Sequence, residues 1–268
     1  MKTEPLVIRQ SLLGDVDTCL RRAQYKIELP PPMISTAWSA LGTAYHKALE
    51  IFYKTGEAKA YQAAVDVYWD EIEITSKEVR YKADLPNDDK TLDTLWAMLN
   101  SYFDGGRYWP VDRYKVLGVE ESFTVEQGDG SKFHGTIDLV LEDQDSGWTI
   151  LVDHKTAGRK WKSDKSNPRR NNQSPFYSFW WQELHPETPG VVFFFDVMTY
   201  KGEFSRLPSI SDERHQAAVM KKATDFQLLY ELVRGAGVDL PVNPSSTLCS
   251  PLYCDFWDVC PSGEALDV

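Results

Sequence analysis

Hydrophobic and polar residues follow two different periods along the chain, and the change between them divides it near residue 110. In the first part the apolar positions recur at helical spacing, as in the stretch Leu41, Ala44, Tyr45, Ala48, Leu49 and Phe52. This spacing predicts helices over residues 11–27, 38–53, 58–80 and 89–107. Pro30-Pro31-Pro32 should end the first unit, and the polar residues 84–89 should separate the last two helices.

Beyond residue 110 the chain becomes rich in β-branched and aromatic residues, which favours strands over 114–125, 133–141, 148–153 and 191–200. Gly128-Asp129-Gly130 and Asp145-Ser146-Gly147 supply hairpin turns. Helices are expected at 171–184 and 212–233, followed by an irregular tail over 241–261. The pattern predicts an α/β fold with a mixed central sheet flanked by helices. We expect one domain (1–268), made of a helical portion (1–110), a sheet core (111–207), and a long helix with a cysteine-bearing tail (208–268).

Two of the expected strands carry a carboxylate near the end of an apolar run. The first run contains Asp138, and the second reads Ile-Leu-Val-Asp153-His154-Lys155. Because side chains alternate faces along a strand, Asp153 and Lys155 should point one way and the His154 side chain the other. If the strands pair, Asp138 can lie beside Asp153. Two buried carboxylates are costly unless a cation bridges them, so a Mg²⁺ or Mn²⁺ site for phosphodiester chemistry is one interpretation. A surface ion pair is the other.

Charge and hydropathy limit the partners. Charged residues make up 26% and hydrophobic residues 42%, and the net charge of −11 argues against general affinity for nucleic acid. Locally, residues 158–170 carry one acid, Asp164, and six basic residues, which are Arg159, Lys160, Lys162, Lys165, Arg169 and Arg170. This segment is either a solvated loop or a contact for a phosphate backbone. No stretch is long and apolar enough to span a membrane, and no signal-peptide core is present, so we expect a cytoplasmic protein with no membrane partner.

Other polar residues could join the carboxylates. His46 lies beside an apolar helical stripe, one turn after Gly42, and either serves the site or is an ordinary core or surface residue. Alternation allows only one of Glu120 and Glu121 to face the site. Gln173 and Tyr177, four residues apart, share one helix face. Trp161, Trp180 and Trp181 could stack on bases, although core packing is expected for at least two of them.

The order of these residues resembles the RecB-like exonuclease branch of the PD-(D/E)xK nuclease superfamily over nearly the whole chain. The resemblance rests on His46, Glu120, Asp138, Asp153, Lys155, Gln173 and Tyr177. It implies a restriction-endonuclease-like core, metal coordination by the histidine and the two aspartates, catalysis by the lysine, and a Gln/Tyr pair near the nucleic acid. Asp153 stands where many members carry glutamate.

The cysteines form a separate pattern. Cys249, Cys254 and Cys260 cluster near the C-terminus, and Cys19 lies far upstream. Four thiolates suit either zinc or a 4Fe–4S cluster, and the spacing favours neither. The resemblance implies the iron–sulfur alternative, because helicase-associated and CRISPR-associated members carry one N-terminal cysteine and a C-terminal trio. The first gap of the trio is wider here than is usual in those members.

The resemblance thus implies a Mg²⁺- or Mn²⁺-dependent DNA exonuclease that acts on single-stranded ends. Asp138, Asp153, His46 and the carbonyl of His154 would hold one or two metal ions. Lys155 would be catalytic together with the two aspartates, and Glu120 would join them as an additional ligand or as a residue that supports a ligand. Gln173, Tyr177 and the basic segment, with Arg159, Lys160, Arg169 and Arg170, would position the strand. A helicase, recombination or CRISPR-adaptation partner is expected, since no phosphate-cradling helicase loop is present. The alternatives are a catalytically silent DNA-binding or scaffolding module and a zinc-dependent interaction protein.

Overall fold

A computed structural model describes residues 6–29, 34–58, 60–74, 78–127, 131–162 and 165–262. The chain divides into two compact units, which are treated in turn. The first consists of Met1–Pro32, Phe123–Gly135 and Ala217–Val268, and the second of Met33–Ser122 and Thr136–Gln216. The turn expected at Gly128-Asp129-Gly130 and the proline run at 30–32 lie outside the described residues.

The second unit is built on a mixed sheet. It contains β6 (Thr149–Ala157), β7 (Val191–Thr199), β8 (Phe204–Ser209) and the parts of β5 (Lys132–Asp143) and β4 (Tyr114–Glu126) outside residues 123–135, and β4 pairs with β5. The β5–β6 and β7–β8 pairs are antiparallel, and the β6–β7 pair is parallel, with Asp153 opposite Phe195 and His154 opposite Asp196. A parallel pair needs a crossover connection, which here contains α6 (Gln173–Leu184). The expected mixed sheet flanked by helices is confirmed.

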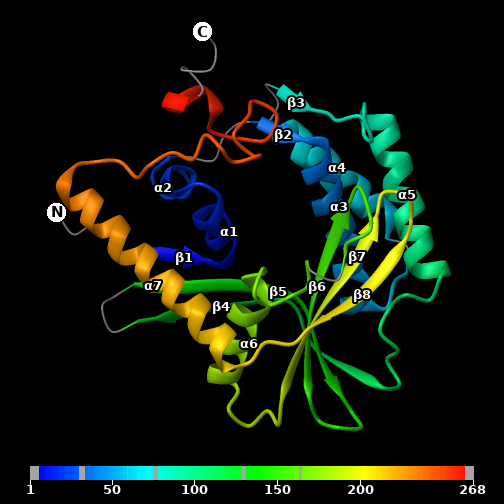
Figure 1. Cartoon of the computed structure of the whole chain (residues 1–268). Coiled ribbons are helices and arrows are strands. Elements are labelled where there is room, and N and C mark those ends of the chain that lie inside the picture. Colours follow the sequence, from blue (N-terminus) through cyan, green and yellow to red (C-terminus); the bar gives the residue numbers. More distant parts are fainter. Residues whose placement is uncertain are drawn as a thin grey trace. The chain divides into compact units, whose positions relative to one another are not determined.

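Helices cover both faces of this sheet (Figure 1). On one face α3 (Ala37–Thr55) packs against α4 (Tyr61–Ile74), α5 (Asp88–Asp104) and β6. Their apolar stripes enclose the main core with Leu139, Leu141 and Val152 of the sheet. On the other face α6 packs on β7, and the ring of Tyr177 stacks on Phe193 with centroids 6.2 Å apart. None of the helices in the described part of the chain has the length and hydropathy needed to cross a bilayer.

Local sequence signals fix the ends of α3 and α5. The Thr36 hydroxyl accepts a hydrogen bond from the N–H of Ser39 at the start of α3, and Gly56 ends that helix with φ of +77°. The Asn87 side chain accepts from the N–H of Lys90 at the start of α5. Such caps satisfy N–H groups that have no partner within the helix, and glycine adopts the left-handed conformation at a helix end without steric cost.

The first unit brings together segments that are distant in sequence. It contains β1 (Val7–Arg9), α1 (Gln10–Thr18), α2 (Leu20–Glu28), most of α7 (Glu213–Ala236) and the 3₁₀ turn Trp257–Val259. Residues Val7 to Arg9 pair in parallel with Lys132 to His134 of β5. Leu12 and Ala23 pack with Phe226, Tyr230 and Leu240 in a separate small core.

The structure corrects several predicted boundaries. The single helix expected at 11–27 is two helices, because Cys19 is extended, with φ of −162° and ψ of 112°. The helix expected at 58–80 ends at Ile74, and Glu78–Arg80 is instead the strand β3, paired with β2 (Ile34–Thr36). The strands β1, β2, β3 and β8 were not predicted. Apart from β8 they span only three residues, too few for an alternating pattern to show.

Candidate functional site

The candidate site lies in the second unit, where the pairing of β5 with β6 ends. The ladder runs from Glu142 opposite Thr149 to Leu139 opposite Val152, and Asp138 and Asp153 are the next residues of the two strands. At this point the carboxylate Oδ2 of Asp138 accepts the main-chain N–H of His154 at 2.7 Å. The end of β6 therefore holds the Asp138 side chain in place.

Asp153 is buried and makes two contacts. Its Oδ2 lies 2.5 Å from the Lys155 ammonium, and its Oδ1 accepts a hydrogen bond of 2.8 Å from the amide of Gln173 on α6. Burial raises the pKa of Asp153 to about 6, and the charge of Asp138 adds to this effect while Lys155 opposes it. The ionised carboxylate is thus held in an unfavourable environment that another cation would improve.

His154 lies between Asp153 and Lys155 but points to the opposite face, as alternation requires. Its ring is 3% exposed and packs against Tyr53 and Tyr102, with centroid distances of 6.2 and 6.4 Å. Burial lowers the pKa of His154 to about 3, which keeps the ring neutral. The ring also lies edge-on to that of His46, with centroids 6.1 Å apart, so it packs beside the candidate site, while the main-chain N–H of His154 holds Asp138.

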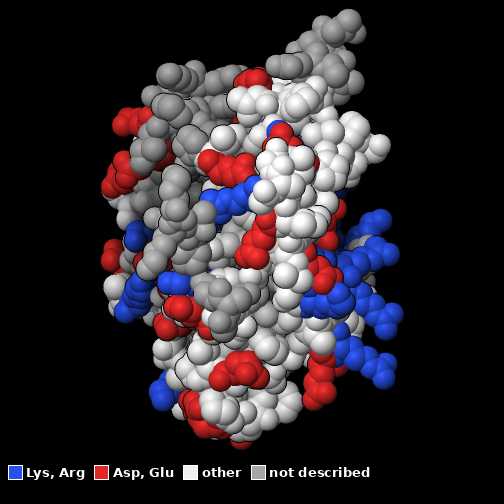
Figure 2. All heavy atoms as spheres, turned by 90° about the vertical axis from the view of Figure 1, so that its left-hand side faces the viewer, with Lys and Arg blue, Asp and Glu red and all other residues white. Residues whose placement is uncertain are grey.

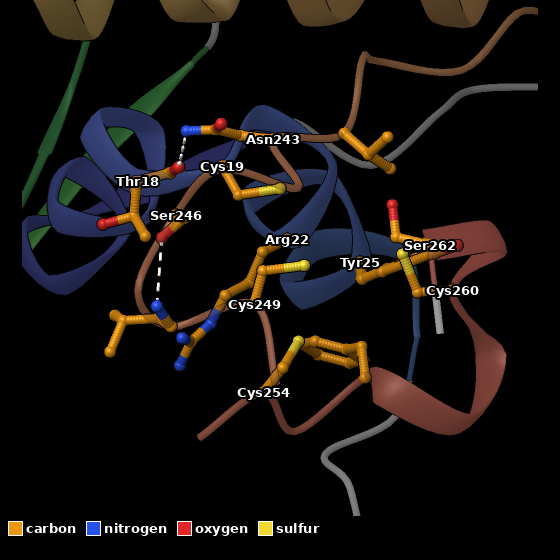
Figure 3. A pocket seen from close by; sticks show the side chains of 13 residues that line it. Thr18, Cys19, Arg22, Tyr25, Asn243, Ser246, Cys249, Cys254, Cys260 and Ser262 are labelled. Carbon is orange, nitrogen blue, oxygen red and sulfur yellow. Dashed lines mark hydrogen bonds between the residues drawn. The ribbon is translucent and has the colours of Figure 1, made fainter. Parts of the chain in front are cut away.

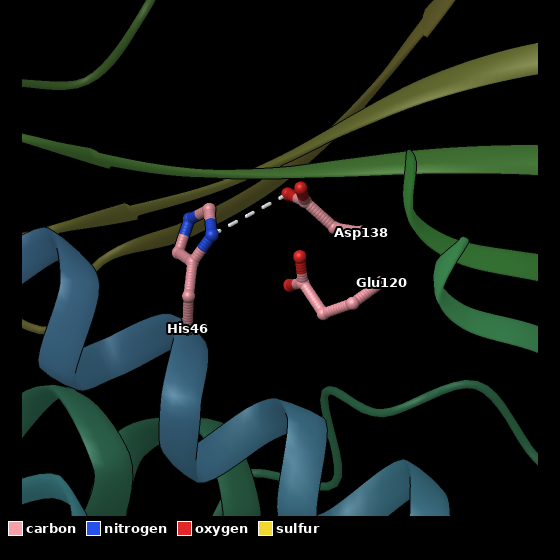
Figure 4. Close-up of side chains that lie close together, drawn as sticks. All are labelled: His46, Glu120 and Asp138. Carbon is pink, nitrogen blue, oxygen red and sulfur yellow. Dashed lines mark ion pairs between the residues drawn. The ribbon is translucent and has the colours of Figure 1, made fainter. Parts of the chain in front are cut away.

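Three side chains from different elements converge beside Asp138 (Figure 4). One ligand atom of each of His46 on α3, Glu120 on β4 and Asp138 on β5 lies within 4.8 Å of the others. The Nδ1 atom of His46 is 3.6 Å from Oδ2 of Asp138. Glu120 has φ of +54°, rare for a non-glycine residue, whereas the next residue, Glu121, is exposed to solvent. Of the two neighbouring glutamates, Glu120 is therefore the one that joins the group.

These residues suit a hard divalent cation. Burial, followed by the nearby charge of Asp138, raises the pKa of Glu120 to about 7, so the two carboxylates repel each other at neutral pH. Carboxylate oxygens with one imidazole suit Mg²⁺ or Mn²⁺. Among the described residues, His46, Glu120 and Asp138 are the group of at least three potential ligands whose atoms lie close enough to bind one ion. Asp153 is not part of this group, and its two oxygens contact Lys155 and Gln173.

A pocket of about 510 Å³ opens at this group. His46, Glu120, His154 and Lys155 line it, and a stripe along α3 adds Trp38, Ser39, Gly42, Thr43, Lys47 and Glu50. Apart from His46 and Gly42, this stripe was not predicted from the sequence to belong to the site. A signal was present, since positions 39, 43, 46 and 50 are polar at helical spacing and therefore share one helix face.

Gly42 brings α3 close to the end of β6. A Cβ atom at this position would lie 3.4 Å from the hydroxyl of Thr156, just one residue beyond Lys155. α3 therefore packs closely on the end of β6 at Gly42, one turn before His46, and leaves little room there for a larger side chain.

The residues expected to contact DNA have different surroundings. Arg159, Lys160, Arg169 and Arg170 are exposed on the loop between β6 and α6, whereas Asp164 lies outside the described residues. Tyr177 is buried, and burial raises its pKa strongly. Of the tryptophans, Trp180 and Trp181 are buried, as expected for core packing, and Trp161 is half-buried beneath the ammonium of Lys165.

The surface charge is uneven despite the net charge of −11. Acidic side chains are scattered over the face drawn in Figure 2, and lysine and arginine side chains gather along its right-hand edge. An acidic net charge therefore leaves room for locally basic surface, which is what contact with a phosphate backbone requires.

The four cysteines line one pocket in the first unit (Figure 3). Cys19 comes from the junction of α1 and α2, and Cys249, Cys254 and Cys260 come from the tail, with their sulfur atoms directed toward the enclosed space. All four are free thiols. No three of their sulfur atoms lie within 4.8 Å of one another. Burial, with the neighbouring cysteines contributing, raises the pKa of Cys249.

Direct contacts fasten the tail to the N-terminal helices. Arg22 forms ion pairs with Asp15 at 3.0 Å and with Asp255 at 3.2 Å, and the Tyr25 hydroxyl donates to the carbonyl of Val259 at 3.1 Å. The Asn243 amide donates to the carbonyl of Thr18 at 2.8 Å. The cysteine pocket is thus formed by chain segments that the surrounding contacts hold together.

Comparisons with known proteins agree with this geometry. A family model described as the PD-(D/E)XK nuclease superfamily matches residues 10–261. A crystal structure described as a "putative exonuclease" from Eubacterium rectale aligns with a TM-score of 0.55 at 12% identity, over 91% of this chain and 86% of that chain. The structure of SSO0001 aligns over 95% and 96% of the two chains at 12% identity, with a TM-score of 0.38, too low to support an argument. No curated protein matched the chain. Because the family model covers nearly the whole sequence, the chain belongs to the PD-(D/E)XK nuclease superfamily.

Proposed function

We propose that this nuclease is a deoxyribonuclease that uses Mg²⁺ or Mn²⁺ to hydrolyse phosphodiester bonds. The observation that carries the proposal is the convergence of His46, Glu120 and Asp138 beside the Asp153–Lys155 pair, at the end of the central strands. A catalytically silent module would have no use for two carboxylates whose pKa values burial raises well above normal.

Each residue has a proposed role. His46, Asp138 and Glu120 hold a divalent ion, and Asp153 and the main-chain carbonyl of His154 complete the set. When bound, the ion lowers the pKa of a water molecule and offsets the charge that develops on phosphorus. Lys155, which lines the pocket, orients that water or stabilises the pentavalent phosphorus. Gln173 fixes the Asp153 carboxylate through its hydrogen bond.

The substrate is proposed to be a single DNA strand with a free end. Exonuclease action is supported by the similar fold of the Eubacterium rectale protein, which is described as a putative exonuclease. The exposed basic loop with Arg159, Lys160, Arg169 and Arg170 would hold the phosphates of the strand. Tyr177, which is buried, would position this side of the site by packing beneath it. Duplex DNA would need a partner, such as a helicase of a recombination or CRISPR-adaptation complex, to separate its strands.

The direct test is digestion of end-labelled single- and double-stranded DNA with Mg²⁺ or Mn²⁺. The wild-type protein should degrade the single strand, and Lys155→Met should lower the rate by about 10²- to 10³-fold because a group that stabilises the transition state is lost. Lys115→Met, which removes an exposed lysine from β4, serves as the matched control. Absence of cleavage by wild-type protein that still binds DNA would instead support a silent DNA-binding module.

We further propose that the four cysteines hold a 4Fe–4S cluster. Four zinc-bound thiolates, each about 2.3 Å from the ion, would lie about 4 Å from one another. Support for the cluster comes from the pocket that all four cysteines line and from the order of one upstream cysteine and a C-terminal trio, and not from the distances between the sulfur atoms. When bound, the cluster would join the α1–α2 junction to the tail. Hydrolysis would not require it to take part in the reaction.

Cys254→Ser should therefore remove the brown colour and the absorbance near about 400 nm of protein purified without oxygen. It should also lower the thermal midpoint, since the tail loses a link to α2. Ser262→Ala, at a residue that lines the same pocket, should keep both properties. A colourless wild-type protein that contains one zinc ion would contradict the iron–sulfur assignment.

A further inference from the structure

The pocket at the candidate metal site extends along α3 to an aromatic residue. Trp38, in the first turn of α3, lines the same pocket as His46, Glu120 and Lys155. Eight residues separate Trp38 from His46, which is about 12 Å along the helix axis. A ligand that reaches both residues must therefore be longer than a single phosphate group.

Trp38 is held by a lysine. The Lys82 ammonium lies 5.0 Å from the centroid of the Trp38 ring and 4.6 Å from that of Tyr200, and it donates a hydrogen bond of 3.1 Å to the Tyr200 hydroxyl. The N–H of Tyr200 donates to the carbonyl of Ala157 at the end of β6. A cation against a ring face stabilises the ring position, so Lys82 connects Trp38 to the strand that carries Lys155.

The wall of the pocket between Trp38 and the metal-site residues does not repel an anion. Ser39, Gly42 and Thr43 line this stretch of α3, and none of them is charged. The acidic residue of α3 that lines the pocket, Glu50, lies one turn beyond His46, and its two oxygens contact Lys47 at 3.0 Å and Lys54 at 2.8 Å. These three groups carry one net positive charge. The Ser39 hydroxyl on this wall can donate to a phosphate oxygen, whereas the Thr43 hydroxyl donates to the main-chain carbonyl of Ser39 at 3.3 Å.

We propose that Trp38 is a stacking platform for one unpaired base of the DNA strand whose phosphate lies at His46 and Glu120, and that Lys82 is the positioning residue for its ring. The proposal rests on the proposed nuclease function and deepens it. An aromatic ring can stack on any base, so the subsite is indifferent to sequence. In a duplex the base is already stacked and paired, so the subsite selects single strands.

A base-removal experiment tests the subsite. Binding of short fluorescent oligodeoxynucleotides, each with one abasic residue at a different position, is measured by anisotropy with Ca²⁺ in place of Mg²⁺. In the wild type, one abasic position should weaken binding by about 5- to 100-fold. Trp38→Ala should weaken binding of the intact strand by a similar factor and should make that abasic position neutral. Trp38→Phe, which keeps a ring, should retain most of the effect.

Trp96→Ala is the matched control, because Trp96 is partly exposed on α5, where its ring packs on Tyr61, and does not line the pocket. It should leave both affinities unchanged. Lys82→Met should weaken binding of the intact strand without any change in the position at which base removal matters. The proposal is overturned if Trp38→Ala and Trp96→Ala behave alike, or if the abasic profile survives in Trp38→Ala. If this occurs while the wild type still cleaves DNA, the nuclease function stands and only the subsite falls.

Discussion

Asp153→Asn is expected to abolish cleavage and, at the same time, to stabilise the metal-free protein. The carboxylate is the proposed further metal ligand and the partner of Lys155, and loss of such a group costs several kcal/mol in the transition state, so the cleavage rate should fall by about 10³-fold or more. Asparagine keeps the oxygen that accepts the Gln173 amide but carries no charge. End-labelled single-stranded DNA measures the first effect, and urea unfolding in the presence of a chelator measures the second.

The sign of the stability effect follows from the pKa of Asp153, which burial raises from 3.8 to about 6. The folded protein binds this proton more tightly than the unfolded chain, so the contribution of Asp153 to stability improves as pH falls from about 6 to 4. At pH 7 the asparagine should gain up to about 3 kcal/mol, and at pH 4 almost nothing. Asp145→Asn, at an exposed hairpin position, should change neither cleavage nor stability. A variant that loses activity and stability together at pH 7 would show that the carboxylate is structural.

Asp196→Ala should be the most destabilising single change near the site, by about 3–5 kcal/mol. Asp196 is 1% exposed and accepts two hydrogen bonds of 2.8 Å from Arg206 and one of 3.1 Å from the Trp109 indole. Without it, a largely buried guanidinium loses its counter-charge while it remains against the Trp109 ring, 3.8 Å from the ring centroid. The midpoint of urea unfolding, with an unchanged slope, measures the loss.

Two further variants show whether the buried charge causes this loss. Asp225→Ala removes an exposed carboxylate that is paired with Lys221 on α7, and should cost less than about 1 kcal/mol. The double variant Asp196→Ala/Arg206→Met removes both charges and should be more stable than Asp196→Ala alone. A double variant that is less stable than Asp196→Ala would show that Arg206 stabilises the fold by packing rather than through its charge.

The sequence indicated most of the nuclease core because each of its long elements carries a clear period. The alternating and apolar runs around Asp138 and Asp153 predicted β5 and β6, and the restriction-endonuclease-like fold implied by the resemblance is confirmed. The three-residue strands were not predicted, because they are too short to show a period and pair with distant residues, more than 100 residues away for β1 and 44 for β2 and β3. The break in the helix at Cys19 was not predicted for a related reason. The neighbouring Thr18 contacts Asn243 of the tail, which lies more than 200 residues away in the sequence.

The site was less predictable than the fold. Alternation along a strand could not decide between Glu120 and Glu121, because the choice depends on a left-handed residue inside β4, at Glu120 itself. Trp38 lines the pocket because of the way α3 packs, which the sequence does not reveal. The polar helix face from Ser39 to His46, in contrast, could be read from the helical spacing. Asp153 contacts Gln173 and Lys155 and not the His46 group. The alternation of residues along a strand cannot predict such side-chain contacts.

The discontinuity of the first unit has a consequence for biosynthesis. Leu12 and Ala23 reach the ribosome exit early, but their core partners Phe226, Tyr230 and Leu240 emerge about 200 residues later. Until then the apolar faces of α1 and α2 have no core to join, whereas most contacts of the second unit can already form. Closing so long a loop is slow, and exposed apolar surface favours aggregation in the interval. The nascent chain should therefore depend on a chaperone until its last segment has been made.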